Sequence, residues 1–162
     1  MGPEQRTDTR VKIPRVARGI IEQFPLGFVA TVTAGQKPNL SPKGTFLILS
    51  DEVIAFAEIR SPRTMAALER NDSIAVNFID IWKRKGVAIN GHVDVVKRGD
   101  DAFGDLLPKW EAAFPSLVER INAVVLIQID SLRMTTTPPY DDGATEDEMI
   151  ALYKAKFSEI YP

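Results

Sequence analysis

The chain has 162 residues, of which 44% are hydrophobic, so it can bury a core and has the usual length of one domain. Its formal net charge is −2 and its pI is about 5.5, which argues against general electrostatic attachment to nucleic acid or to an anionic membrane. The absence of cysteine excludes disulfides, thiolate nucleophiles and cysteine-ligated zinc.

The N-terminal residues 1–13 are polar and aperiodic, and we expect them to form a mobile arm ahead of a single domain that occupies the rest of the chain. The first eighteen residues contain no apolar leader segment. The longest apolar runs, such as AVVLI at 123–127, are too short to span a bilayer. We therefore expect a soluble, cytoplasmic protein.

Short runs rich in β-branched and aromatic residues, separated by turn residues, predict six strands, over residues 27–33, 40–50, 53–57, 73–80, 85–96 and 123–136. Pro42 indicates that the second strand lies at an edge or contains a bulge. In the fifth strand, alternation predicts one core-facing row, made of Val87, Ile89, Gly91, Val93 and Val95.

Helices are predicted between and around these strands. One follows Pro14, one spans 62–70, and one runs through 101–114 with a break or kink near Pro108. Capping-box spacing at 116–119 and at 145–148 predicts a helical turn and a terminal helix that ends near Ile160. The terminal segment 138–162 is thus a loop followed by a helix. The whole pattern predicts a mainly β (α+β) fold, a six-stranded antiparallel barrel with peripheral helices.

The sequence EIRSPRTMAALERND at 58–72 contains a candidate anion site. Ser61 suits the N-cap and Pro62 the first position of the predicted helix, whose first turn leaves free backbone N–H groups. Two hydroxyls and the Arg63 guanidinium stand beside these groups, which is an arrangement that binds anions. A capped surface helix with a solvated Arg63 is the alternative interpretation.

Few other residues or motifs indicate a catalytic site. His92 is the only histidine and has Asp94 two residues further along the same strand face, but no nucleophile is marked beside it. One histidine without cysteine does not supply a zinc site, and no two glycines form Gly-x-Gly. No catalytic residue can be assigned. An enzyme built on this chain would depend on a bound organic cofactor.

Taken together, four segments resemble the FMN-binding split barrel of the pyridoxamine 5′-phosphate oxidase-like family. These segments are GFVATVT, GQKPNLSPKGTFLI, VIAFAEIRSPRTMAALERNDSIAVNF and GVAINGHVDVV, and the resemblance covers roughly residues 15–135. Its most specific part is SPRTMAALERN, where the family places the flavin phosphate. The resemblance implies a split barrel.

Carried over residue by residue, the resemblance implies that five residues bind FMN: Ser41, Lys43, Ser61, Arg63 and Thr64. It also implies a homodimer with the cofactor at the subunit interface. The charged run 83–85 could approach the cofactor of a partner chain, but such a run at a hairpin is typically solvated, and we leave it out of the site.

The function implied is that of an FMN-dependent oxidoreductase acting on a small organic substrate. The alternatives are a flavin-binding protein without turnover, serving as a redox sensor or cofactor store, and a related barrel that uses haem or a deazaflavin. Oxidation of vitamin B6 is not favoured, because the chain ends in MIALYKAKFSEIYP instead of the family's basic, Trp- and Arg-containing segment. Binding of single-stranded nucleic acid is disfavoured by the acidic charge and the 8% aromatic content.

Overall fold

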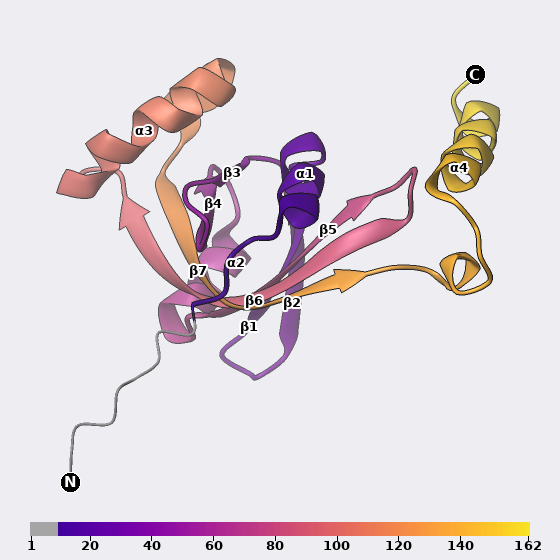
Figure 1. Ribbon diagram of the computed structural model, residues 1–162. Helices are drawn as coiled ribbons and strands as arrows, with labels where there is room; N and C mark the ends of the chain where they lie inside the picture. The colour runs from indigo at the N-terminus through magenta and orange to yellow at the C-terminus, as the bar shows by residue number, and fades with distance from the viewer. Residues whose placement is uncertain (1–9) are drawn as a thin grey trace, which may run out of the picture.

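The computed structural model describes residues 10–162, which form one curled antiparallel sheet with helices around it (Figure 1). The sheet has seven strands, in the order β2 (Pro38–Lys43), β1 (Gly27–Val32), β5 (Ser73–Asp80), β6 (Lys85–Lys97), β7 (Ala123–Thr135), β4 (Val53–Glu58) and β3 (Phe46–Ile48). The four α-helices are α1 (Arg15–Gln23), α2 (Pro62–Arg70), α3 (Asp101–Ala113) and α4 (Glu146–Ile160). No helix within residues 10–162 is long and apolar enough to cross a membrane.

The two edge strands are consecutive in the chain. β2 and β3 lie at opposite edges of the sheet, yet only Gly44 and Thr45 separate them. The sheet must therefore curl until its edges meet at this bend, which makes an antiparallel split barrel. The predicted barrel with peripheral helices is confirmed, but the predicted strand over 40–50 is two strands, so there are seven strands and not six.

The bend is held by buried hydrogen bonds. The Thr45 hydroxyl donates to the carbonyl of Ala57 at 2.9 Å and accepts from the N–H of the same residue at 3.0 Å. The Trp110 indole N–H of α3 donates to the Thr45 carbonyl at 2.8 Å. A side chain and a helix thus satisfy backbone groups that the interrupted strand leaves unpaired.

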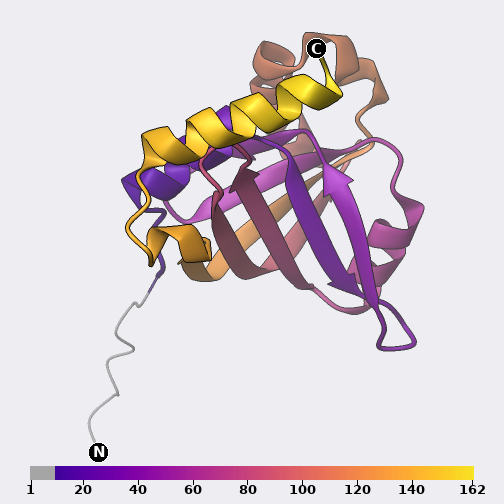
Figure 2. The ribbon, with the colours of Figure 1, turned by 90° about the vertical axis from the view of Figure 1, so that its right-hand side faces the viewer.

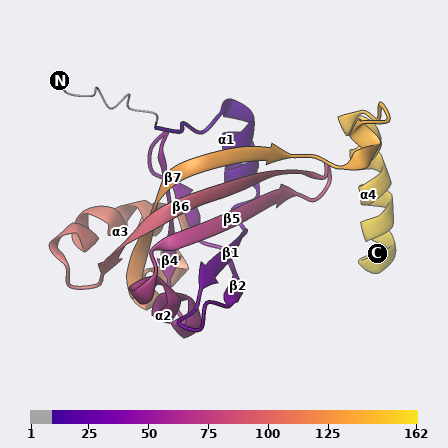
Figure 3. The same ribbon diagram turned by 90° about the horizontal axis from the view of Figure 1, so that it is seen from below.

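Apolar side chains pack on both faces of the sheet. Inside the barrel, β6 buries Val87, Ile89, Gly91 and Val93 as predicted, and α1 packs over this cluster. On the outer face, α3 covers β6 and β7 with a second cluster that includes the fully buried Trp110 (Figures 1 and 3). The helix is not broken near Pro108, since α3 continues through it.

Some local signals are confirmed and others are wrong. Thr145 and Glu148 form the predicted capping box of α4. The helical turn predicted at 116–119 is present as a 3-10 helix, η1 (Pro115–Arg120), but it has no side-chain cap, so the capping box is wrong. Residues 1–9 of the predicted arm lie outside the described residues. Residues 10–13 are not a mobile arm, since Ile13 is buried in the core and its N–H donates to the Asp51 carbonyl at 2.8 Å.

The tip of the β5–β6 hairpin holds the C-terminal helix. Lys83 and Lys85 pair with Glu146 at 3.0 and 2.8 Å, and the Arg84 guanidinium lies 3.8 Å from the centre of the Tyr153 ring. The charged run 83–85 is therefore not simply solvated. Hydrogen bonds from Lys85 and Lys83 lower the pKa of Glu146. Their stabilising effect is therefore present above the usual pKa of a carboxyl group and is lost as the pH falls from there through the lowered pKa.

Replacing Thr45 with Val should destabilise the protein, because the buried N–H and C=O of Ala57 both lose their hydroxyl partner. We expect a loss of about 1–3 kcal/mol in the free energy of unfolding. Urea denaturation followed by circular dichroism measures it. Thr45→Ser keeps the hydroxyl and is the matched control. If both variants unfold at the same urea concentration, the hydroxyl does not stabilise the bend.

Candidate functional site

The first turn of α2 leaves its backbone N–H groups free of side-chain caps. Ser61 occupies the N-cap position as predicted, but its side chain does not cap the helix. Instead, its backbone N–H and its hydroxyl donate to Glu58 Oε1 at 2.6 and 3.2 Å. Glu58 ends β4 and is buried, so it fixes the segment that leads into the helix. The positive end of the α2 dipole is left facing the space beside β2.

The edge strand β2 has an inverted pattern. Its polar residues Asn39, Ser41 and Lys43 are opposite the buried Thr31, Val29 and Gly27 of β1, so they point toward the inside of the sheet. The alternate residues, two prolines and Leu40, are exposed. The polar row therefore faces α2 and not the apolar core.

Two side-chain contacts organise this polar row. The Asn39 amide donates to the hydroxyl of Thr31 at 3.2 Å and to that of Thr64 at 3.4 Å, which ties β2 to α2. The Lys43 ammonium donates to the Ser41 hydroxyl. Thr64 is only 1% exposed and Lys43 only 9%, so both polar groups lie at the floor of the site.

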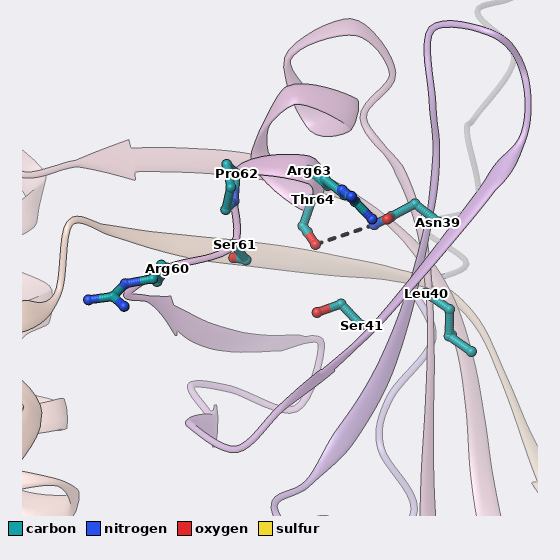
Figure 4. Close-up of a pocket in the computed structure, with 8 residues that line it drawn as sticks. All are labelled: Asn39, Leu40, Ser41, Arg60, Ser61, Pro62, Arg63 and Thr64. Atoms are coloured by element: carbon teal, nitrogen blue, oxygen red, sulfur yellow. Dashed lines mark hydrogen bonds between the residues drawn. The ribbon is translucent and has the colours of Figure 1, made fainter.

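Two adjoining grooves run between β2 and the first turn of α2. Their volumes are about 300 and 320 Å³, and both are lined by Ser41, Arg60 and Ser61. The first also has Asn39, Leu40 and residues 62–64, and the second has residues 42–45, Ala57 and Ile59. Figure 4 shows the hydroxyls of Ser41, Ser61 and Thr64 around one space, while Leu40 points away from it.

Positive charge gathers at these grooves. Arg60 and Arg63 are exposed, and neither forms an ion pair with any residue in the range 10–162. Burial lowers the pKa of Lys43, and the nearby Glu58 carboxylate opposes this effect. Two unpaired guanidinium groups, a buried amine, the hydroxyls of Ser41 and Thr64 and the helix N-terminus are the donor set that a phosphate monoester requires.

The structure brings all five residues predicted to bind the cofactor to these grooves. Ser41, Ser61, Arg63 and Thr64 line the first, and Lys43 lines the second. The sequence analysis missed Asn39, Arg60 and Glu58. The alternation of polar residues at 39, 41 and 43 was a usable signal for Asn39. The role of Glu58 could not be predicted, because it depends on the burial of a strand end.

The only histidine lies elsewhere. His92 Nδ1 is 2.9 Å from Asp130 Oδ1 on the exposed outer face of the sheet, and neither residue lines the grooves. A register shift between Asn90 and Gly91 marks a bulge opposite Asp130, and a Cβ at Gly91 would collide with the Gln128 carbonyl. Hence His92 is paired with Asp130 and not with Asp94. Within residues 10–162 no three acidic or histidine side chains gather to hold a metal ion.

Three solved structures show how widely this fold occurs. HupZ of Group A Streptococcus is 22% identical, with 77% of this chain and 95% of that chain covered and a TM-score of 0.67. An FMN-binding protein from Syntrophomonas wolfei is 14% identical, covers 75% and 84%, and has a TM-score of 0.61. A Clostridium acetobutylicum protein related to general stress protein 26, of the pyridoxinephosphate oxidase family, is 16% identical, covers 73% and 84%, and has a TM-score of 0.57.

At these identities the solved structures establish the fold alone, and no curated protein sequence matches the chain. The family follows from a different comparison. The sequence model of the pyridoxamine 5′-phosphate oxidase family matches residues 13–137, a span that contains the whole sheet and both grooves. The chain therefore belongs to the pyridoxamine 5′-phosphate oxidase family.

Proposed function

We propose that this protein binds FMN in the grooves between β2 and α2 and uses it as the redox cofactor for a small organic substrate. The observation that carries the proposal is the uncapped first turn of α2 beside Arg60, Arg63 and the hydroxyls of Ser41 and Thr64. This donor set suits the terminal phosphate of FMN. Family membership and the fold shared with an FMN-binding protein support the same cofactor.

Different residues of the grooves would hold different parts of FMN. The N–H groups of α2, Arg63 and Thr64 hold the phosphate, and Asn39 keeps Thr64 and β2 in register. Lys43 and the bend at Gly44 lie in the second groove, where the flavin ring has room. When bound, FMN supplies electron transfer to and from its ring. The protein orients the cofactor and places a positive charge beside it.

The other cofactors and functions are less well supported. None of the residues that line the two grooves is a His, Cys, Met or Tyr, so no common axial haem ligand is present there. A deazaflavin, and flavin binding without turnover, remain the alternatives to test. Absorption spectra of the purified protein and the mass of the cofactor released on denaturation identify the cofactor. Reduction by a nicotinamide nucleotide with turnover of an acceptor separates an enzyme from a sensor or store.

A homodimer with the cofactor at the subunit interface is part of the proposal. No charge lies at the outward positions of β1 and β2, or at those of β5 and β6 along residues 75–79 and 88–90. We call these positions the uncharged sheet face: Phe28, Ala30, Val32, Pro38, Leu40, Pro42, Ala75, Asn77, Ile79, Ala88 and Asn90. Exposed sheet surface of this kind is usually covered by a partner. Since β2 has this face on one side and the grooves on the other, a second copy docked there would lie next to the cofactor.

A cytoplasmic location is also part of the proposal. The absence of cysteine and the acidic charge support a cytoplasmic protein that does not bind nucleic acid.

Lys43 indicates that the site lowers the stability of the protein. A buried amine is harder to charge than one in water, and this is why its pKa lies below the usual 10.5. The charged amine therefore opposes folding at neutral pH, and this penalty shrinks as the pH rises and the amine loses its proton. Such a penalty is common where a binding site is built for a ligand and not for the empty fold.

Arg63→Ala should weaken FMN binding by about ten- to a hundredfold, because it removes one charge-assisted contact of roughly 1.5–3 kcal/mol. Riboflavin lacks the phosphate, so its weaker binding should hardly change. Arg63→Lys should restore part of the loss, since a point charge cannot reproduce the planar guanidinium. Fluorescence titration of the apoprotein measures all of these affinities.

Arg70→Ala is the matched control for this prediction, because Arg70 is an exposed arginine in the last turn of the same helix. It should leave both affinities unchanged. Equal losses for FMN and riboflavin in Arg63→Ala would mean that Arg63 supports the structure and does not bind the phosphate.

Lys43→Met should weaken FMN binding and yet raise the urea midpoint of unfolding at pH 7. The gain in stability should vanish as the pH rises toward 10.5, the usual pKa of the amine, because the penalty exists only while the amine is charged in the unfolded chain. Denaturation at pH 7 and pH 10 tests the sign. A destabilised variant with normal FMN affinity would make Lys43 a structural residue.

Phe28→Glu should dissociate the proposed dimer, since it places a charge in the centre of an uncharged contact. Phe28 is 41% exposed in the single chain, so the fold should survive. Analytical ultracentrifugation should give about twice 18.0 kDa for the parent and 18.0 kDa for the variant. Gln36→Glu, in the exposed β1–β2 turn, is the control and should stay dimeric. A monomeric parent protein would reject the dimer.

A further inference from the structure

The C-terminal helix α4 stands apart from the barrel. Figures 1 and 3 show it beyond the tip of the β5–β6 hairpin, and within residues 10–162 no other helix or strand packs along it. Its attachment is local. The Trp82 and Phe157 rings meet edge to face at 5.2 Å, and the Tyr140 hydroxyl donates to the Lys83 carbonyl at 2.6 Å. Of the fifteen residues of α4, only Met149 is fully buried.

One flank of α4 is uncovered and carries two exposed apolar residues, one on either side of a lysine. Leu152, Lys156 and Ile160 follow one another at helical spacing, and Leu152 and Ile160 are 46% and 61% exposed. Tyr161, just after the helix, is 83% exposed. Isolated helices of this length are marginal in water, and most helical stability in proteins comes from packing an apolar face. Contact with the hairpin tip covers only part of that face.

The exposed apolar residues gather on one side of the molecule. All large exposed hydrophobic residues within 10–162 lie on α1, in or next to β1 and β2, at the hairpin tip, at the end of β7, or on α4 and the residue after it. None lies on α2, α3, β3 or β4. Figure 2 looks at this side, with α4 nearest the viewer and crossing in front of the strand ends beside α1. Helix α4 and the strands that carry the uncharged sheet face therefore lie on the same side of the molecule.

We infer that α4 is an exchanged arm that packs its Leu152 and Ile160 flank against a second copy of this chain. When two uncharged sheet faces meet, each partner occupies the side of the other molecule on which α4 stands. A fifteen-residue helix is about 22 Å long, enough to extend across several strands spaced about 4.8 Å apart. Two-fold symmetry makes the two arms reciprocal.

The size of the interface supports a second copy as the occupant. The uncharged sheet face has eleven residues, whereas a stable interface has roughly 20–30 residues on each side. Packing of α4 against the partner would add contact area beyond that of the uncharged sheet face. One chain thus carries both the arm and the face it needs, which gives a closed, self-complementary dimer. The inference rests on the proposed homodimer and does not depend on which cofactor is bound.

The absence of native cysteine permits a clean test on the full chain. Leu152→Cys is labelled with a benzophenone maleimide and irradiated, and the products are separated by mass in denaturing gels. We expect a shift from 18.0 kDa to about twice that mass. Lys154→Cys is the matched control, because Lys154 is exposed on the opposite flank of α4 and should give little of the larger product.

Sedimentation of Leu152→Glu gives an independent measurement. Its dimer dissociation constant should rise at least about tenfold, or 1.4 kcal/mol, while Lys154→Glu should leave it unchanged. If the protein is a dimer but the probe at 152 gives only 18.0 kDa products, the arm inference is wrong and the dimer stands. A monomeric parent protein would rule out both the arm and the dimer. If the probe at 152 crosslinks to twice the mass but the protein does not bind FMN, the arm inference stands and the proposed cofactor is wrong.

Discussion

The bend at Gly44 and Thr45 is the constraint on which the rest of this structure depends. It sends two consecutive strands to opposite edges of one sheet, so the sheet can only curl and leave a seam where the edges diverge. Thr45 and the Trp110 indole satisfy the backbone groups that the bend frees. Helix α2 packs against β1 and β2 beside this seam, and the two grooves lie between its first turn and β2.

The seam also explains the unusual pattern of β2. A strand beside a closed core would turn apolar residues inward, but β2 turns Asn39, Ser41 and Lys43 inward and Leu40 outward. The inward row meets the grooves, and the outward row joins the uncharged sheet face. One edge strand therefore lines the grooves on one side and the uncharged sheet face on the other, so a substitution in β2 can affect both surfaces.

Local sequence patterns predicted the elements well, and the five proposed ligand residues do lie together. The α2 boundaries at 62 and 70 and the buried row of β6 followed from capping residues and alternation alone. What failed depended on distant partners. The Ser61 side chain turns to Glu58 because a strand end is buried there, and His92 meets Asp130 because a bulge shifts the register. The charged run at 83–85 could not predict that its lysines pair with Glu146, because that residue lies about sixty positions further along the chain.

The positions of the two tryptophans have a practical consequence. Trp110 is fully buried and bonded to Thr45, which lines the second groove, so its emission should be blue-shifted and quenched when a light-absorbing ligand enters. Trp82 is only half-buried and stacks edge-on against Phe157 of the terminal helix. The chain thus contains two natural optical reporters, one beside the seam and one at the base of the helix. Replacing one indole at a time would let the two regions be followed separately, each in a variant that keeps a single tryptophan.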